Sequence, residues 1–243
     1  MALNRIMLLE LCRRMQPGAT VASFGYPDIT VPMPELEPYL NGLDVTFRVD
    51  SPAICARHGI QQRPIPDADS LFKALGAKLT VFDIVKERGN EIICDLNEPI
   101  EPISANRPFS YDFVLDIGTI EHCFNIGQAI KNIANLPQIG GIIMHENPFF
   151  MPNHGFYSLN PTFYTDFYET NGFKVLECLL IHGKEQAKPP PTSRFKTEAM
   201  DATNVFFMAE RVEFRPFVWP TQTKYKKIYA AAGLSGDKEI AHG

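Results

Sequence analysis

The fold is decided by residues 111–148, YDFVLDIGTIEHCFNIGQAIKNIANLPQIGGIIMHENP. An apolar strand stops at an acidic residue, a Gly-Thr turn and a helix follow, and a Gly-Gly break precedes a second apolar strand. Such runs are typical of strands that are buried on both faces of a parallel sheet. Open α/β sheets bind ligands at the carboxyl ends of these strands. The polar residues of the segment fall at those ends: Asp116, Gly118, Thr119, Glu121 and His122 after the first strand, and His145, Glu146 and Asn147 after the second.

Further strands are predicted on both sides of this segment. Residues 19–24, 78–83 and 91–95 are short and largely apolar. Residues 173–181 and 204–211 are also apolar, and the segment between them has no room for a crossover helix of ordinary length, so we expect an antiparallel pair. The sequence therefore predicts a doubly wound α/β fold, with a mostly parallel, seven-stranded, Rossmann-like sheet and a C-terminal antiparallel hairpin.

Helices are predicted where capping residues precede a helical pattern. Asn160 followed by Pro161 is a good start for a helix over residues 161–170. Asp67 or Asp69 could cap a short helix that ends at Gly76.

The pattern divides the chain into three parts. An N-terminal helix (1–17) precedes the α/β domain (18–212), and a C-terminal helix and tail (213–243) follow it. Within the α/β domain we expect an irregular insertion at about 26–66, which includes a possible edge strand at 44–50, and a flap at about 182–203.

Composition excludes several classes of protein. The 243 residues are 45% hydrophobic with a net charge of -5, and they contain no long basic run, which argues against nucleic acid as the main partner. The sequence contains no run of about 18 apolar residues, so it predicts no membrane span. The five cysteines are scattered and form no CxxC pair, which is typical of a reduced, cytoplasmic protein. The GxxxxGK[ST] motif of P-loop NTPases does not occur.

Two acids at strand ends indicate a nucleoside site. A strand-end carboxylate can accept hydrogen bonds from both hydroxyls of a ribose. Asp83 follows the apolar run LTVF, and Asp95 follows after one short turn, which suits one acid at the sugar and one near the base. Asp50 is the alternative ribose acid, because it ends residues 44–50 at a more ordinary distance from Gly25.

Two histidines after the second strand are candidate general bases. His154 is the first choice and His145 the second, because an imidazole titrates near neutral pH. A metal site of His145, Glu146 and His154 is conceivable, but its loop spacing is not a recognised ligand pattern, so no metal is predicted. His122 is either a structural histidine or a cofactor contact. Aromatic residues around Tyr157, itself a candidate catalytic residue, could line the substrate pocket.

The combined pattern resembles the class I S-adenosylmethionine-dependent methyltransferases over about residues 18–212. The matching motifs are VASFGYPD (21–28) as a degenerate first cofactor loop, VFD (81–83), CDLNEP (94–99), YDFVLDIGTIEH (111–122), GGIIMHENP (140–148) and NVFFMAER (204–211). The first loop departs from the family because it has only Gly25 in place of several glycines, so Tyr26, Pro27 and Asp28 would have to rebuild its contacts.

The resemblance implies a methyltransferase of the small-molecule or sugar type, with S-adenosylmethionine as cofactor and a hydroxyl or amine as acceptor. The protein would mainly position the reactants and exclude water. A homodimer is possible. The implied cofactor-binding residues are Ser23, Gly25, Tyr26, Asp83, Asp95, Leu96, Asp116, Gly118, Thr119 and His122.

Two other functions remain open on the sequence. The poor glycine loop favours a non-catalytic binding or scaffold protein that kept the sheet. A nucleotide-sugar enzyme without methyl transfer is the third reading.

Overall fold

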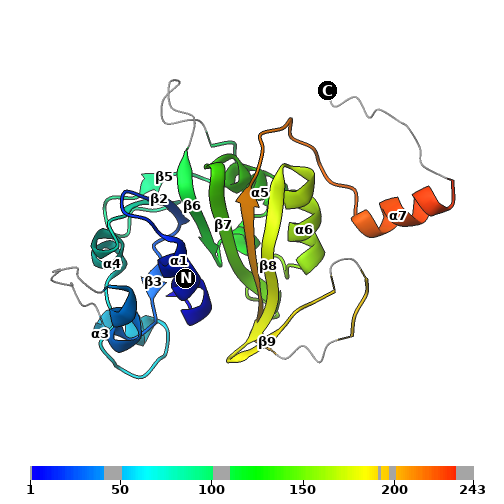
Figure 1. The fold of residues 1–243 in the computed structure, drawn as a ribbon. Coiled ribbons are helices and arrows are strands. Elements are labelled where there is room, and N and C mark those ends of the chain that lie inside the picture. Colours follow the sequence, from blue (N-terminus) through cyan, green and yellow to red (C-terminus); the bar gives the residue numbers. More distant parts are fainter. Residues whose placement is uncertain (1, 41–50, 101–109, 191–192, 197–200, 234–243) are drawn as a thin grey trace.

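The computed structural model describes residues 2–40, 51–100, 110–190, 193–196 and 201–233. Its centre is an eight-stranded sheet with helices on both faces (Figure 1). The strands, in chain order, are β2 (Thr20–Phe24), β4 (Lys78–Asp83), β5 (Ile92–Ile93), β6 (Tyr111–Ile117), β7 (Pro137–Phe150), β8 (Phe173–His182), β9 (Glu185–Ala187) and β10 (Thr203–Arg211).

The strand order is β5-β4-β2-β6-β7-β10-β8-β9. Neighbours from β5 to β7 pair in parallel, whereas β10 is antiparallel to both β7 and β8. The predicted fold class is confirmed. The sheet has eight strands rather than seven, because the three-residue strand β9 adds an edge inside the predicted flap.

The order of the sheet reverses next to β2. The chain passes outward from β2 through β4 to β5 and then returns to the other side of β2 to form β6 and β7. Such a reversal is a topological switch point, and it opens a crevice at the carboxyl ends of the two strands that flank it. We therefore expect a ligand site at the carboxyl ends of β2 and β6.

The helices, in chain order, are α1 (Arg5–Arg14), α2 (Met33–Leu36), α3 (Ser51–Arg57), α4 (Ala68–Ala74), α5 (Ile126–Asn135), α6 (Pro161–Thr170) and α7 (Thr223–Ala231), with 3₁₀ turns η1 (Glu37–Tyr39) and η2 (Ile120–His122). Asp67 caps α4 through a bond from Ser70 N at 3.1 Å, as predicted. Asn160 precedes α6, but its side chain makes no capping bond.

The N-terminus differs from the prediction of an N-terminal helix over residues 1–17. Ala2–Leu3 forms strand β1, which pairs in parallel with β3 (Asp28–Ile29), and α1 begins only after Asn4. The Asn4 side chain accepts a hydrogen bond from Met7 N at 3.0 Å, which is why the helix starts there. The predicted edge strand at 44–50, with Asp50, lies outside the described residues.

Two hydrophobic clusters hold the layers together. Helices α1 and α4 pack on one face of the sheet, against residues such as Phe113 and Leu115 of β6. Helices α5 and α6 pack on the other face, against Val114 of the same strand. Because β6 is buried on both faces, its apolar run is continuous, and each fully buried side chain contributes about 1.5–3 kcal/mol.

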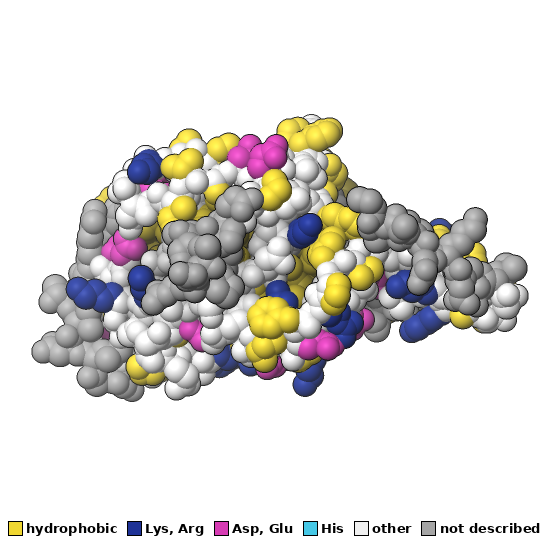
Figure 2. Space-filling view, turned by 90° about the horizontal axis from the view of Figure 1, so that it is seen from above, with side chains coloured by type: hydrophobic (Ala, Val, Ile, Leu, Met, Phe, Trp, Pro, Cys, Tyr) yellow, Lys and Arg dark blue, Asp and Glu magenta, His cyan; other side chains and the backbone are white. Residues whose placement is uncertain are grey.

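Figure 2 shows a face with lysine, arginine and acidic side chains scattered among hydrophobic ones, and no described histidine is visible on it. Helix α7 stands away from the body and buries none of its residues (Figure 1). In the described part of the chain, no helix combines the length and the apolar character that crossing a bilayer requires.

Candidate active site

The two turns at the switch point are bonded to each other. Gly25 ends β2 with φ 80° and Gly118 ends β6 with φ 72°, a left-handed conformation that favours glycine. The Thr119 hydroxyl donates to Phe24 O at 2.8 Å, which joins the turns. The Ser23 hydroxyl donates to Gly25 O at 2.8 Å, and Ser23 is fully buried. Ser23 therefore shapes the first turn and does not present its side chain to a ligand.

The predicted nucleoside acids lie on the β4 and β5 side of the switch point. Asp83 is the last residue of β4, is partly exposed, and accepts a bond from Val85 N at 3.3 Å. Asp95 is exposed and accepts from Asn97 N at 2.9 Å. Ile84 and Val85 are 65% and 55% exposed, so an apolar surface directly follows the first acid.

Leu96, which was predicted to contact the cofactor, is only 6% exposed. It packs in the cluster of α5 and α6, so its side chain supports the core beneath this edge of the sheet.

The first cofactor loop is held by its own neighbours. Asp28 is 1% exposed and accepts bonds from Arg57 Nη1 at 3.1 Å and Arg88 Nη2 at 3.2 Å. The third partner is His58, whose Nε2 lies 2.9 Å from the same carboxylate. The idea that Asp28 rebuilds cofactor contacts is therefore wrong for its side chain, because arginine and histidine already surround it.

Tyr26 also faces the protein. Its ring is 7% exposed and lies under the Arg88 guanidinium at 4.2 Å, and its hydroxyl donates to Asp67 Oδ1 at 2.5 Å. Burial and the bond to Asp67 raise the pKa of Tyr26. The predicted side-chain contact of Tyr26 with a cofactor is replaced by a role in fastening the loop to the start of α4.

A buried hydrogen-bond network lies beneath the β6 turn. Asp116 Oδ1 accepts from Thr119 N at 3.1 Å and from Ile120 N at 3.3 Å, while Oδ2 lies 2.7 Å from His145 Nδ1. His145 Nε2 lies 2.6 Å from the Tyr168 hydroxyl. In the neutral tautomer with the proton on Nδ1, the ring donates to Asp116 and accepts from Tyr168.

Asp116 and His145 are both fully buried, so two predictions need correction. Asp116 shapes the turn through bonds inside the protein, and its side chain has no exposed surface. His145 is not a candidate base, because both ring nitrogens are bonded inside the protein. The strand β7 continues to Phe150, which places His145 between Asp116 of β6 and Phe207 of β10 rather than at a strand end.

Glu121 extends this network toward the surface. Its Oε2 accepts from Asn147 Nδ2 at 2.9 Å, and the same nitrogen donates to Asp116 at 3.0 Å. The Tyr164 hydroxyl donates to Asn147 Oδ1 at 2.5 Å and so fixes the amide. Glu121 has no exposed surface, and its Oε1 has no hydrogen-bond partner among the described residues. Burial, followed by the negative charge of Asp116, raises the pKa of Glu121 to about 7.

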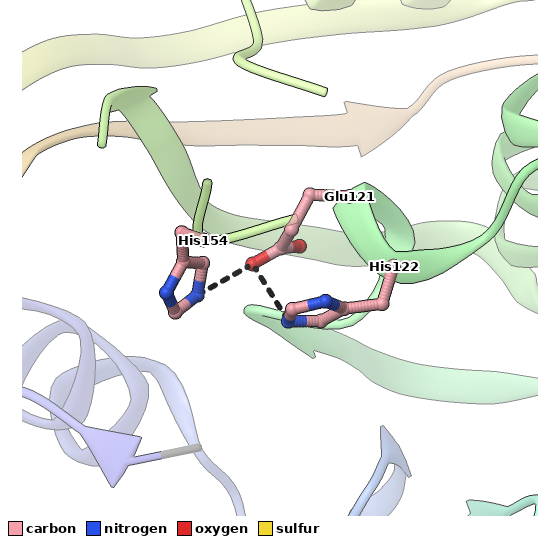
Figure 3. Close-up of side chains that lie close together, drawn as sticks. All are labelled: Glu121, His122 and His154. Atoms are coloured by element: carbon pink, nitrogen blue, oxygen red, sulfur yellow. Dashed lines mark ion pairs between the residues drawn. The ribbon is translucent and has the colours of Figure 1, made fainter. Parts of the chain in front are cut away.

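Two histidines flank the unpartnered oxygen of Glu121. His154 Nε2 lies 3.6 Å and His122 Nε2 3.8 Å from Oε1, and Figure 3 shows both rings beside the carboxylate. Their side chains are 42% and 48% exposed. Burial, and then the charge of His154, lowers the pKa of His122. This cluster of Glu121, His122 and His154 is called the EHH cluster below.

The loop that carries His154 is docked on the backbone of Glu121. Phe156 N donates to Glu121 O at 2.8 Å, and a Cβ on Gly155 would lie 2.8 Å from that same oxygen. Only glycine permits this approach. The loop geometry therefore sets the position of His154 relative to Glu121.

The EHH cluster lines a pocket of about 230 Å³ at the carboxyl ends of β6 and β7. Glu146 lies in the same pocket, with Oε1 accepting from Asn204 Nδ2 at 3.1 Å and Oε2 without a hydrogen-bond partner in the described structure. Burial raises the pKa of Glu146 to about 7. The pocket thus contains two buried acids, Glu121 in η2 after β6 and Glu146 in β7. Either acid could bind a polar group or take up a proton.

Tyr157 does not line this pocket. Its hydroxyl donates to Phe124 O at 2.8 Å, and next to it Phe156 packs edge-on against Phe124 with ring centres 5.4 Å apart. Tyr157 is therefore a positioning residue that ties the loop to Phe124, just beyond η2, rather than a residue of this pocket.

The pocket unites three of the predicted site residues: Gly118, His122 and His154. The metal site of His145, Glu146 and His154 is not formed, because His145 lies inside the sheet. Glu121 instead lies beside His154 and His122, although the sequence indicates it only as one of the polar residues after the first strand. The signal for Glu121 was its position next to His122, directly after the strand-end turn.

No protein-family model and no curated protein matches the chain. Among solved structures, it is similar to 1,6-didemethyltoxoflavin-N1-methyltransferase of Burkholderia thailandensis, which was crystallised with S-adenosylhomocysteine: 12% identity, TM-score 0.48, covering 86% of this chain and 78% of that one. It is also similar to the N-methyltransferase NodS of Bradyrhizobium japonicum WM9, with 12% identity, TM-score 0.47 and coverage of 86% and 94%. Similarity at this level supports no further argument, so the fold class is assigned from the strand order and pairing of the structure itself.

Proposed function

We propose that the chain is a methyltransferase that uses S-adenosylmethionine and methylates a hydroxyl or amine of a small molecule or sugar. The observation that carries the proposal is the distribution of polar groups around the switch point. Asp83 and Asp95 follow β4 and β5 on one side of β2, and the acidic pocket with the EHH cluster lies on the other side, at β6 and β7. A nucleoside on one side and an acceptor on the other would meet over the bonded turns.

The residues on the β4 side suit the nucleoside part of the cofactor. The partly exposed carboxylate of Asp83 could accept both ribose hydroxyls. The exposed side chains of Ile84 and Val85 offer an apolar surface for the base. When bound, S-adenosylmethionine supplies an electrophilic methyl group on a sulfonium sulfur.

The chain's own residues would bind the acceptor and remove its proton. His154 is the proposed base, because its imidazole is exposed at the pocket and its Nε2 lies 3.6 Å from Glu121 Oε1. Glu146 would accept a hydrogen bond from the acceptor inside the pocket. The pocket is small and polar, which favours a compact polar group over a bulky apolar one.

One observation favours the alternative of a non-catalytic binding or scaffold protein. The first loop has a single glycine, and the side chain of Asp28 is already bound by Arg57, His58 and Arg88. A loop fastened in this way offers fewer groups to the methionine part of a cofactor.

Calorimetry with S-adenosylmethionine and S-adenosylhomocysteine separates these functions. The methyltransferase should bind both, and Asp83→Ala should weaken binding while Glu169→Ala, an exposed acid on α6, should not. Absence of binding at millimolar cofactor would leave the scaffold function. Binding of a nicotinamide cofactor without S-adenosylhomocysteine would instead support a nucleotide-sugar enzyme.

A further inference from the structure

We infer that the EHH cluster binds a divalent transition-metal ion of the zinc and iron class. One donor atom from each of Glu121, His122 and His154 lies within 4.8 Å of the other two. Two imidazole nitrogens and one carboxylate oxygen form a ligand set that such ions use in proteins. This site shares His154 with the set that the sequence suggested, but it has Glu121 and His122 in place of His145 and Glu146. It does not depend on the cofactor.

Two of the three separations between the ligand atoms are close to those of a bound ion, and the third is within 4.8 Å. A tetrahedral ion with bonds of about 2.1 Å holds its ligand atoms about 3.4 Å apart. The two nitrogens now lie 3.6 Å and 3.8 Å from Glu121 Oε1. Both histidines are partly exposed, so small rotations of their side chains would close the difference without moving the backbone.

The unpartnered oxygen of Glu121 is an independent sign of a ligand. A buried carboxylate oxygen without a hydrogen bond carries a desolvation cost that a cation would remove. The other oxygen is held by Asn147, which orients the carboxylate as outer partners of metal ligands do. Figure 3 shows Oε1 pointing to the space between the two rings.

The donor types select the metal. Imidazole nitrogen favours zinc, iron, cobalt, nickel and copper over magnesium and calcium, which prefer oxygen. Three protein ligands leave at least one coordination position for water or an acceptor, and the adjoining pocket is lined by Glu146. With an ion bound, the lone pair of His154 Nε2 is occupied, so the ion would take over from the imidazole in lowering the pKa of a hydroxyl acceptor. Only this last use rests on the proposed function.

The test is a metal titration of the untagged full chain after treatment with a chelator, in the absence of S-adenosylmethionine. We expect one Zn²⁺ per chain by calorimetry and visible absorption bands with Co²⁺, whereas Mg²⁺ should not bind at the same concentrations. His122→Ala and His154→Ala should each weaken Zn²⁺ binding at least about tenfold. His182→Ala, at the end of β8 and outside the cluster, is the matched control and should bind as the wild type does.

Either of two results would overturn the inference: no stoichiometric Zn²⁺ binding, or histidine variants that bind Zn²⁺ as tightly as the control. Circular dichroism establishes that each variant is folded, which is expected because both side chains are partly exposed. If the chain binds the metal but not S-adenosylmethionine, the proposed function is wrong and the metal site stands. If it binds S-adenosylmethionine but not the metal, only the metal site is wrong.

Discussion

Glu121 should make the stability of the protein depend on pH in a way that one substitution removes. Its pKa is raised from an ordinary 4.5 to about 7, first by burial and then by the charge of Asp116. Below pH 4.5 the acid is protonated in the folded and unfolded states alike. Between pH 4.5 and 7 the unfolded chain loses the proton while the folded chain keeps it, so the free energy of unfolding falls as the pH rises.

The size of the effect follows from the two pKa values. At about 1.4 kcal/mol for each pH unit between them, the ionised acid lowers stability by up to roughly 3 kcal/mol above pH 7. Glu121→Gln keeps an acceptor for Asn147 Nδ2 but has no charge to bury. The variant should therefore gain stability relative to the wild type as the pH rises from 5 to 8. Glu146 titrates in the same range, but it does so in both proteins and cancels in the difference.

The assay is urea unfolding followed by circular dichroism at pH 5, 6, 7 and 8, with a chelator present so that no metal ion stabilises the carboxylate. Glu169→Gln is the matched control, because this acid is exposed on α6. The reasoning fails if the difference between Glu121→Gln and the wild type is the same at every pH.

Three further substitutions test the proposed site. Asp83→Ala should weaken binding of S-adenosylmethionine by about 1–3 kcal/mol in calorimetry, since a charged hydrogen-bonding partner is lost; unchanged affinity would move the ribose role to Asp50. His154→Ala should reduce turnover far more than cofactor affinity, and wild-type turnover would show that His154 is not the base; its role as a metal ligand is tested by the metal titration. Gly155→Ala places a Cβ 2.8 Å from Glu121 O, so thermal unfolding should show a loss of about 1–3 kcal/mol, together with weaker Co²⁺ binding. Normal stability and binding in that variant would mean that the loop is not held as described.

The parallel strands could be predicted because burial on both faces leaves a continuous apolar run. That signal marked β2, β4, β6 and β7, and the short connection between β8 and β10 gave their antiparallel pairing. The pairing of β1 with β3 could not be predicted, since two residues on each side carry no period.

The candidate site was predicted less completely, because a continuous apolar run does not indicate where the polar side chains at its end point. The sequence marked His145 as a strand-end residue, but β7 extends five residues beyond it and encloses it. The partners of Asp28 lie 29 to 60 residues away along the chain, so no local pattern indicated them. His154 and His122 were recognised as candidates, but the docked Gly155 loop that brings them together depends on tertiary structure.

The amide nitrogen of Asn147 donates to two acids, Asp116 and Glu121. Because Tyr164 of α6 bonds to the same amide, this helix helps to fix the acid at the pocket. Tyr164 holds the other end of that amide, and Tyr168 holds His145 against Asp116. A change in either tyrosine would loosen a side chain, Asn147 or His145, that is bonded to an acid at or beneath the pocket. Substitutions that redirect this pocket to another substrate would therefore have to be chosen together with those at Tyr164 and Tyr168 of α6.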